Sequence, residues 1–176
     1  MEEDKCFLNY HGKAQCYHVY EMLEKFCADV FISCTARQSF LIDAAYKTLP
    51  DLDAYAHRGP AAGVLTAFSK YPSNNFLVIG CDYPFLAHTE INGFLKNVPR
   101  NALAAAFFDE HSQCYQPILA WYSSEAGVLL QKSGSLKELL EDVNAFKHIP
   151  VDPNSIRSVD TKQESVEVMH TINFNY

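Results

Sequence analysis

The sequence lacks any hydrophobic run long enough to cross a membrane, which needs about 20 consecutive, predominantly apolar residues. Its first residues, Met-Glu-Glu-Asp-Lys, are charged where a secretory signal would need an apolar stretch. Basic residues are in the minority, with 14 Lys and Arg against 21 Asp and Glu and a net charge of −7. These features argue against a membrane protein, a polybasic membrane-binding patch and a nucleic-acid-binding surface.

Motifs for zinc and for nucleophilic hydrolysis are also missing. No two cysteines have Cys-x-x-Cys spacing, and the nearest cysteine–histidine pair, Cys16 and His18, is two residues apart. Residues two apart do not face each other on a helix, so this pair argues against a zinc site. The six cysteines lie mostly among apolar or aromatic neighbours, which is typical of reduced thiols in a cytoplasmic protein. The Gly-x-Ser-x-Gly motif of serine hydrolases is absent.

What the chain does contain is enough apolar sequence for a sizeable core. Of its 176 residues 48% are hydrophobic, which favours one domain over residues 1–176. Segments with helical apolar spacing alternate with short apolar runs, and this predicts a three-layer α/β/α domain with a mostly parallel sheet. The expected helices are 15–26, 39–46, 64–70, 90–97, 124–131, 136–146 and 162–172, and the expected strands are 29–34, 76–79, 102–108, 116–122 and 149–152.

One of these strands leads to the first candidate site residue. The run Phe-Leu-Val-Ile from Phe76 to Ile79 has no polar alternation, which predicts a central strand buried on both faces. Asp82 follows at its carboxyl end, where ligands bind in open α/β sheets. A carboxylate there is placed to hold Mg²⁺, which favours one or two carboxylates and substrate phosphates. On this segment alone, an aspartate that only starts a turn is an equal alternative.

A second candidate is the loop Arg58-Gly59-Pro60-Ala61-Ala62-Gly63, which enters the expected helix 64–70. The free backbone N–H groups at such a helix entry can bind a phosphate, a ribose or the edge of a base. A tight helix entry without a ligand is the simpler alternative, because one Gly-Pro turn is a weak signal.

Several segments match one family in order along the chain. They are Asp4-Lys5 with Tyr10–Lys13, Arg58–Gly63, Gly80–Leu86, Gln116–Ala120, Ser135–Leu140 and Ser158–Thr161. Together they resemble the molybdenum cofactor guanylyltransferases and, more widely, the MobA-like nucleotidyltransferases of the nucleotide-diphospho-sugar transferase fold, which is Rossmann-like. The resemblance implies an enzyme that moves GMP from GTP onto molybdopterin with Mg²⁺ as cofactor and pyrophosphate as product. GTP and molybdopterin are then its small-molecule partners.

The resemblance also implies roles for residues that bind the nucleotide. Lys5 matches the lysine that pairs with the nucleotide phosphates, and it is one of two implied catalytic residues. Asp53 matches a residue that helps to hold the nucleoside. Gly59, Pro60 and Gly63 match the loop near base and ribose.

Two aspartates match the implied metal site. Asp82, the second implied catalytic residue, matches the aspartate that binds Mg²⁺ and the nucleotide. Asp160 lies where relatives carry Asn or Asp in an Asn-x-Asn-Thr-Pro segment, which here is Ser158-Val-Asp-Thr-Lys162. Two positions of this segment depart from the family pattern. Aspartate is a better Mg²⁺ ligand than asparagine, and Asp160 is the implied second metal ligand.

The largest departure is at the start of the chain. The family opens with a strand and a glycine-rich phosphate loop, whereas Met1 here aligns with the end of that loop. We therefore expect a fold truncated at the first strand, and a polypeptide of residues 1–176 that is inactive on its own. The gap beside a central strand predicts poor stability or self-association. The resemblance implies other proteins of molybdenum cofactor biosynthesis as further partners.

Two other functions fit the same residues. The first is a cytidylyltransferase or another nucleotidyltransferase of the same fold, since one sequence does not distinguish GTP from CTP or identify the acceptor. The second is a non-catalytic binding module that keeps the fold without the phosphate loop. Nucleotide binding and upstream coding sequence are the observations that separate them.

Overall fold

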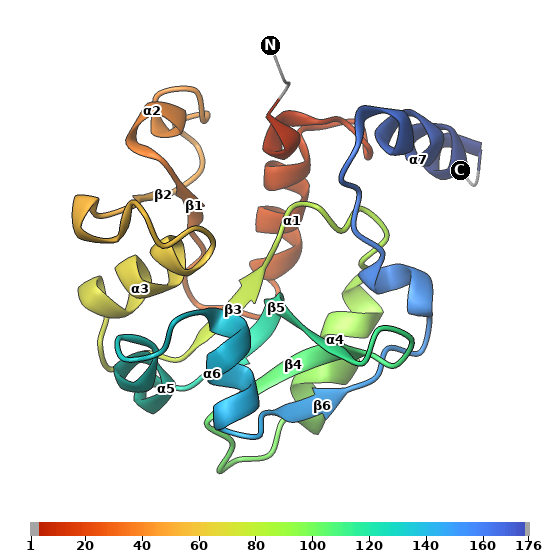
Figure 1. Ribbon diagram of the computed structural model, residues 1–176. Helices are drawn as coiled ribbons and strands as arrows, with labels where there is room; N and C mark the ends of the chain where they lie inside the picture. Colours follow the sequence, from red (N-terminus) through yellow and green to blue (C-terminus); the bar gives the residue numbers. More distant parts are fainter. Residues whose placement is uncertain (1–3, 175–176) are drawn as a thin grey trace.

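The protein is described by a computed structural model that covers residues 4–174. Its main sheet has four strands in the order β3-β5-β4-β6, and a separate parallel pair is formed by β1 and β2 (Figure 1). The strands are β1 (Ile32–Cys34), β2 (Thr48–Pro50), β3 (Phe76–Ile79), β4 (Ala104–Asp109), β5 (Cys114–Tyr122) and β6 (Phe146–His148).

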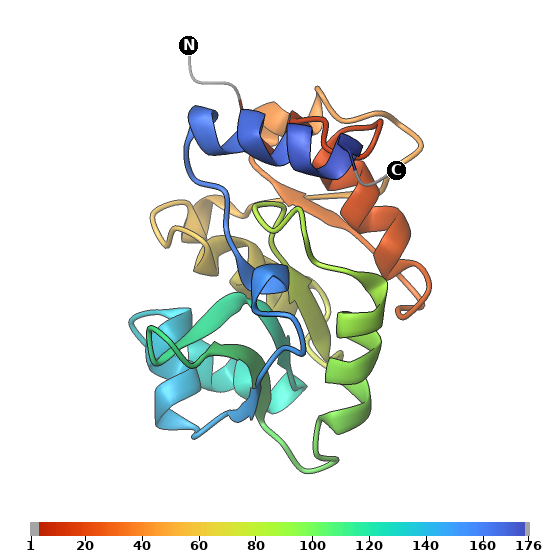
Figure 2. The same cartoon turned by 90° about the vertical axis from the view of Figure 1, so that its right-hand side faces the viewer.

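Helices cover both faces of the main sheet, as the side view in Figure 2 shows. One face packs against α3 (Ala61–Lys70), α5 (Ser124–Leu130) and α6 (Leu136–Asp142), and the other packs against α1 (Gln15–Leu23) and α4 (His88–Asn97). The remaining elements are α2 (Ala36–Ser39), α7 (Lys162–Phe174) and the 3-10 turns η1 (Lys5–Phe7), η2 (Asp53–Tyr55) and η3 (Pro153–Ile156). The predicted α/β/α layering is confirmed, while the single domain over 1–176 stays a prediction. Within residues 4–174, every helix is too short or too polar to cross a membrane.

The strand buried on both faces is β4, not β3. Residues Ala104 to Phe108 are each at most 6% exposed, whereas every residue of β3 is only half-buried. The run Phe76–Ile79 does send alternate side chains into the two cores, as predicted. Its central position was wrong, because within the described chain β3 pairs only with β5 at one end of the sheet order. Apolar runs reveal covered faces but not the number of neighbouring strands.

Most strands of the main sheet point in the same direction, but neighbouring strands pair in both parallel and antiparallel ways. β3 and β4 both lie antiparallel to β5, and β6 lies parallel to β4, so β5 alone runs opposite to the other three. A tight turn sends β5 back along β4, because the carboxylate of Asp109 accepts hydrogen bonds from the His111 amide and the Ser112 hydroxyl. Pro117 is tolerated inside β5 because the register with β4 shifts there, in a bulge between Ala106 and Phe107.

Several predicted boundaries were wrong for local reasons. The helix expected at 39–46 is α2 (Ala36–Ser39), and Asp43 instead forms a turn by accepting a hydrogen bond from the Ala45 amide. α6 stops at Asp142 because Asn144 takes the left-handed conformation (φ 48°), so the chain enters β6 at Phe146 rather than forming a strand at 149–152. The helix expected at 90–97 begins two residues earlier, at His88, with Ala87 as its N-cap.

The contact between α5 and α3 gives a stability prediction. A Cβ atom at Gly127 would lie 2.4–2.8 Å from ring carbons of Phe68, a buried side chain that also packs edge-on against Phe76. We expect Gly127→Ala to lower the free energy of unfolding by about 1–3 kcal/mol, the usual cost of overpacking a core. Gly93→Ala is the matched control, since no atom lies within 4 Å of its Cβ and alanine favours the helix by about 0.5–1 kcal/mol. Equal midpoints for both variants in urea unfolding would contradict this packing argument.

Candidate functional site

The centre of the candidate site joins residues from opposite ends of the chain. Lys5 Nζ lies 2.8 Å from Asp160 Oδ1, an ion pair across 155 positions of sequence. The segment that carries Asp160 runs alongside the loop after β3, because the Val159 amide donates to the Asp82 carbonyl at 2.9 Å. The structure therefore brings Lys5, Asp82 and Asp160 into one place.

Asp82 is the electrostatically unusual member of this group. Its Oδ1 is buried and, within residues 4–174, has no hydrogen-bond partner. Burial raises the pKa of this carboxyl, and the nearby charge of Asp160 adds to that effect, while a hydrogen bond from the Asp82 backbone amide and the charge of Lys5 oppose it. A Cβ at Gly80 would lie 2.4 Å from this oxygen, so only glycine lets the carboxylate fold back over the end of β3. An ionised carboxylate held without a partner is a group that a cation would stabilise.

Lys5 and Asp160, the ion pair beside Asp82, each favour the charged form. A hydrogen bond from Lys5 lowers the pKa of Asp160, which also accepts one from Ser158 Oγ at 3.1 Å. The hydrogen bond to Asp160 likewise raises the pKa of Lys5, and the charge of Asp82 contributes. The site thus holds two carboxylates and one ammonium group, with both side chains of the ion pair substantially exposed to solvent.

These residues fit Mg²⁺ bound together with a phosphate-bearing ligand. No cluster of three or more metal-ligating side chains occurs in the part of the chain that is described, so a cage made only of protein ligands does not fit. Mg²⁺ usually takes one or two carboxylates and completes its octahedron with water and substrate phosphates. Asp82, with its unpaired oxygen, would be the first of these ligands and Asp160 the second.

A second group of polar side chains surrounds the start of α3. A Cβ at Gly63 would lie 2.1 Å from Ser33 Oγ and 3.6 Å from Asp51 Oδ1, so the glycine leaves room for both side chains. Ser33 Oγ donates to Asp51 Oδ1 over a long 3.5 Å, and burial raises the pKa of Asp51. Sequence reasoning missed Asp51, although it follows β2 just as Asp82 follows β3, and the rule about carboxyl ends of strands applies equally to both.

In the described part of the chain, the other residues predicted to bind a nucleotide are not bonded to Asp82 or to the Lys5–Asp160 ion pair. Asp53 is exposed at the first position of η2, Gly59 is an exposed turn residue with φ 54°, and Pro60 is the N-cap of α3. Within the described residues, no hydrogen bond or ion pair links these three to Lys5, Asp82 or Asp160.

The turn η1 is bonded to α2 on one side and to Asp160 on the other. Asp4 caps η1 by accepting a hydrogen bond from the Cys6 amide, and its other carboxylate oxygen accepts one from the Gln38 side chain of α2. The next residue, Lys5, reaches Asp160 on the other side. The position of the Lys5 ammonium therefore depends on how η1 is held.

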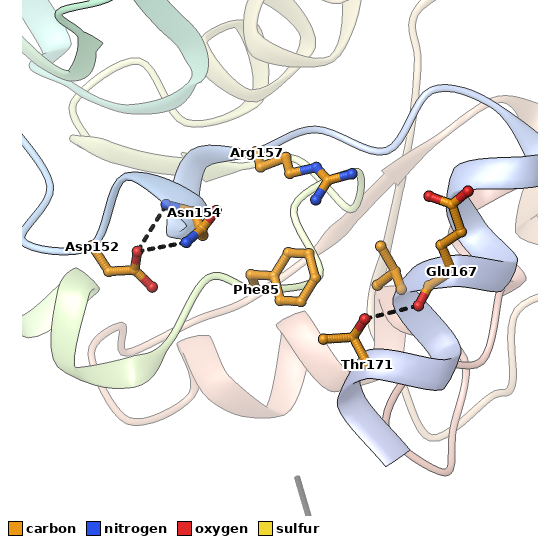
Figure 3. Close-up of a pocket in the computed structure, with 7 residues that line it drawn as sticks. Phe85, Asp152, Asn154, Arg157, Glu167 and Thr171 are labelled. Carbon is orange, nitrogen blue, oxygen red and sulfur yellow. Dashed lines mark hydrogen bonds between the residues drawn. The ribbon is translucent and has the colours of Figure 1, made fainter. Parts of the chain in front are cut away.

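A cavity of about 320 Å³ lies beyond the segment that carries Asp160 (Figure 3). Phe85 lies at its centre in this view, with Arg157 from the segment before Asp160 and Glu167 and Thr171 from α7 around it. Lys5, Asp82 and Asp160 do not line it. The cavity therefore does not mark the candidate site.

Comparison with known proteins gives consistent matches. The sequence profile of the MobA-like NTP transferase domain matches residues 1–148. A molybdenum cofactor biosynthesis bifunctional protein from Synechocystis sp. is 28% identical over 137 residues, which are 77% of this chain and 39% of that protein. A molybdenum cofactor guanylyltransferase from Shewanella sp. (strain MR-4) is 24% identical in an alignment of 179 residues that covers 97% of this chain and 89% of that protein. This chain thus spans well under half of the first relative and most of the second.

A solved structure shows the same fold. The crystal structure of molybdopterin-guanine dinucleotide biosynthesis protein A from Archaeoglobus fulgidus superposes with a TM-score of 0.70 at 18% identity. The match covers 97% of this chain and 91% of that one. At this identity the likeness establishes the arrangement of helices and strands.

Proposed function

This chain belongs to the MobA-like NTP transferase domain family, and from that membership we propose that it transfers GMP from GTP to molybdopterin and releases pyrophosphate. The observation that carries the proposal is the buried, unpartnered carboxylate oxygen of Asp82 beside the Lys5–Asp160 ion pair. The names of two relatives, both from molybdenum cofactor biosynthesis, support the choice of GTP and molybdopterin.

The reaction is a displacement at phosphorus. A phosphate oxygen of the acceptor attacks the α-phosphorus of the nucleotide, and the bond from that phosphorus to the oxygen of the departing pyrophosphate breaks. Such transfers need positioning and charge neutralisation more than covalent participation by the protein. Mg²⁺, when bound by Asp82 and Asp160, would supply Lewis-acid stabilisation of the phosphate oxygens.

The protein's own groups have separate tasks in this proposal. The ammonium group of Lys5, which donates a hydrogen bond to Asp160 in the structure, pairs with phosphate oxygens of the nucleotide. Asp82 and Asp160 would hold Mg²⁺ and so fix where the nucleotide phosphates bind. Gly63, Ser33 and Asp51 shape the wall of the site at the start of α3, and Asp53, Gly59 and Pro60 stay our candidates for contact with base and ribose.

The test is a panel of GTP, CTP and ATP, each with Mg²⁺ and molybdopterin, with pyrophosphate release as the readout. The assay uses the protein at its full natural length. We expect release with GTP and none without the acceptor or the metal. Turnover with CTP alone would assign a cytidylyltransferase instead, and binding of nucleotide without turnover would support a binding module.

The close approach at Gly63 gives a prediction for nucleotide affinity. The methyl carbon of Gly63→Ala would lie 2.1 Å from Ser33 Oγ. The Ser33 hydroxyl would therefore have to move away from Asp51. We expect GTP to bind about tenfold more weakly, the loss of roughly one hydrogen bond to a charged group, as measured by calorimetry with Mg²⁺. The same clash should lower the melting temperature of Gly63→Ala. Adding Ser33→Ala removes the clashing oxygen, so the double variant should regain the melting temperature of the wild type but not its affinity for GTP. Unchanged affinity in Gly63→Ala would remove this wall from the nucleotide site.

A further inference from the structure

His11 makes a hydrogen bond to the loop that carries Asp82. Its ring nitrogen Nε2 lies 2.9 Å from the carbonyl oxygen of Pro84, two residues after Asp82. A carbonyl oxygen can only accept a hydrogen bond, so Nε2 carries the proton and donates it. Among the described residues, no other hydrogen bond joins residues 4–14 to the loop 80–87. This contact is therefore the direct link between the first part of the chain and that loop.

The ring of His11 is held in place by its neighbours. It stacks on the ring of His18 in α1, with 3.9 Å between the ring centroids and 16° between the ring planes. The chain reverses around His11, with an antiparallel bridge between Asn9 and Ala14. Burial lowers the pKa of His18 to about 4, so this ring is neutral near pH 7 and places no charge beside His11. The stacked pair thus supports the donor in one orientation.

The same chain reversal is continuous with the turn that carries Lys5. The Leu8 amide donates to the Lys5 carbonyl at 3.3 Å where η1 ends, and the Leu8 carbonyl accepts from the Gln15 amide at 2.8 Å. Lys5 and the reversal that holds His11 are therefore parts of one hydrogen-bonded unit. The contact made by His11 determines where the loop of Asp82 lies relative to this unit.

Other contacts hold the loop of Asp82 from its remaining sides. The Tyr83 hydroxyl donates to the side chain of Gln116 at 3.1 Å, which anchors the loop to β5. Pro84 is buried, and without a donor at position 11 its carbonyl oxygen would have no hydrogen-bond partner among the described residues. An unpaired buried acceptor is unfavourable enough to shift a loop toward another partner or toward water.

We propose that His11 is a positioning residue for nucleotidyl transfer, which holds the Pro84 carbonyl and thereby fixes Asp82 relative to Lys5. The effect on turnover rests on the proposed function, whereas the effect on the loop does not. His11 acts through the backbone of the loop and touches neither the nucleotide nor the metal. Loss of its donor should weaken the binding of Mg²⁺ together with the nucleotide, because Asp82 and Lys5 would no longer face the same phosphate group.

The structural arm of the test replaces the two stacked rings one at a time. His11→Phe keeps an aromatic ring but removes the donor, whereas His11→Gln keeps a donor, since glutamine Nε2 lies as many bonds from Cα as histidine Nε2. His18→Phe is the matched control, because His18 makes no side-chain hydrogen bond among the described residues. In hydrogen–deuterium exchange we expect the amides of residues 82–86 to exchange on the order of 10-fold faster in His11→Phe alone. Equal exchange in His11→Phe and His18→Phe would overturn the proposal.

The activity arm measures pyrophosphate release with GTP against Mg²⁺ concentration, in protein of full natural length. We expect His11→Phe to need on the order of 10-fold more Mg²⁺ for half-maximal turnover, His11→Gln to lie closer to the wild type, and His18→Phe to match it. A lower melting temperature of His11→Phe without a change in this concentration would overturn the positioning role. Absence of turnover in the wild type on any nucleotide would instead contradict the proposed function, while hydrogen exchange would still decide whether His11 fixes the loop.

Discussion

Replacing Asp82 by Asn is expected to lower the Mg²⁺-dependent release of pyrophosphate by about 100-fold or more, the usual loss when one group that stabilises transition-state charge is removed. The amide keeps the shape of the side chain but cannot supply an anionic oxygen to a metal. Asp82 Oδ1 is buried and has no hydrogen-bond partner among the described residues, so the substitution breaks no hydrogen bond at this oxygen. The measurement is kcat/KM for GTP across a Mg²⁺ titration, in protein of full natural length.

The same variant should not be less stable than the wild type. Burial raises the pKa of Asp82, which means that its ionised carboxylate is less favourable in the folded state than in the unfolded chain. A neutral amide removes that cost, so we expect an equal or higher melting temperature at pH 7. Such a trade between stability and activity is common at functional sites. Asp142→Asn, an exposed change on α6, is the control that should alter neither property. Full turnover in Asp82→Asn would exclude Asp82 from the mechanism.

Replacing Lys5 by Gln is expected to lower kcat/KM for GTP by about 100-fold, because the phosphates lose a charge partner in the transition state. The ammonium already faces two carboxylates, those of Asp160 and Asp82, and its pKa is raised by the first of them. Loss of the cation should also leave Asp160 without its ion-pair partner. Activity should then depend less steeply on ionic strength than in the wild type.

Measuring the stability of Lys5→Gln shows whether a loss of turnover comes from a loss of folding. The Lys5–Asp160 pair is exposed, with 43% and 66% of the two side chains accessible, and such pairs contribute about 0–1 kcal/mol. Lys47→Gln is the matched control, since it breaks an equally exposed pair with Asp29 at 2.6 Å. We expect both variants to unfold at nearly the same urea concentration and only Lys5→Gln to lose turnover. Equal turnover in the two variants would contradict a role for Lys5.

The elements that sequence patterns predicted well are those defined within a few residues. α1 was predicted from apolar residues at 3- and 4-residue steps, and the structure places its start at Gln15 as expected. Ser135 caps α6 by accepting a hydrogen bond from the Glu138 amide at 3.1 Å, which fits the Ser-x-x-Glu spacing of a capping box. Thr161 accepts one from the Glu164 amide at the start of α7 in the same way. Each of these features needs only neighbours in the chain.

The site was predicted in part for the same reason. An apolar run followed by small residues and an aspartate determined that Asp82 lies at the carboxyl end of a strand. No local pattern distinguished Asp51 from Asp53, and only the packing of Gly63 against Ser33 and Asp51 separates their surroundings.

By itself the sequence determined the alternation of helices and strands, the apolar faces of those elements and the aspartate at the end of β3, since each depends on spacing along one short segment. Only the tertiary structure decided that β5 lies antiparallel between β3 and β4, that β4 rather than β3 is buried on both faces, and that Lys5 reaches Asp160. Strand order and an ion pair across 155 positions depend on how separate elements pack together. That packing is settled by the burial of all the apolar faces at once, which no single segment encodes.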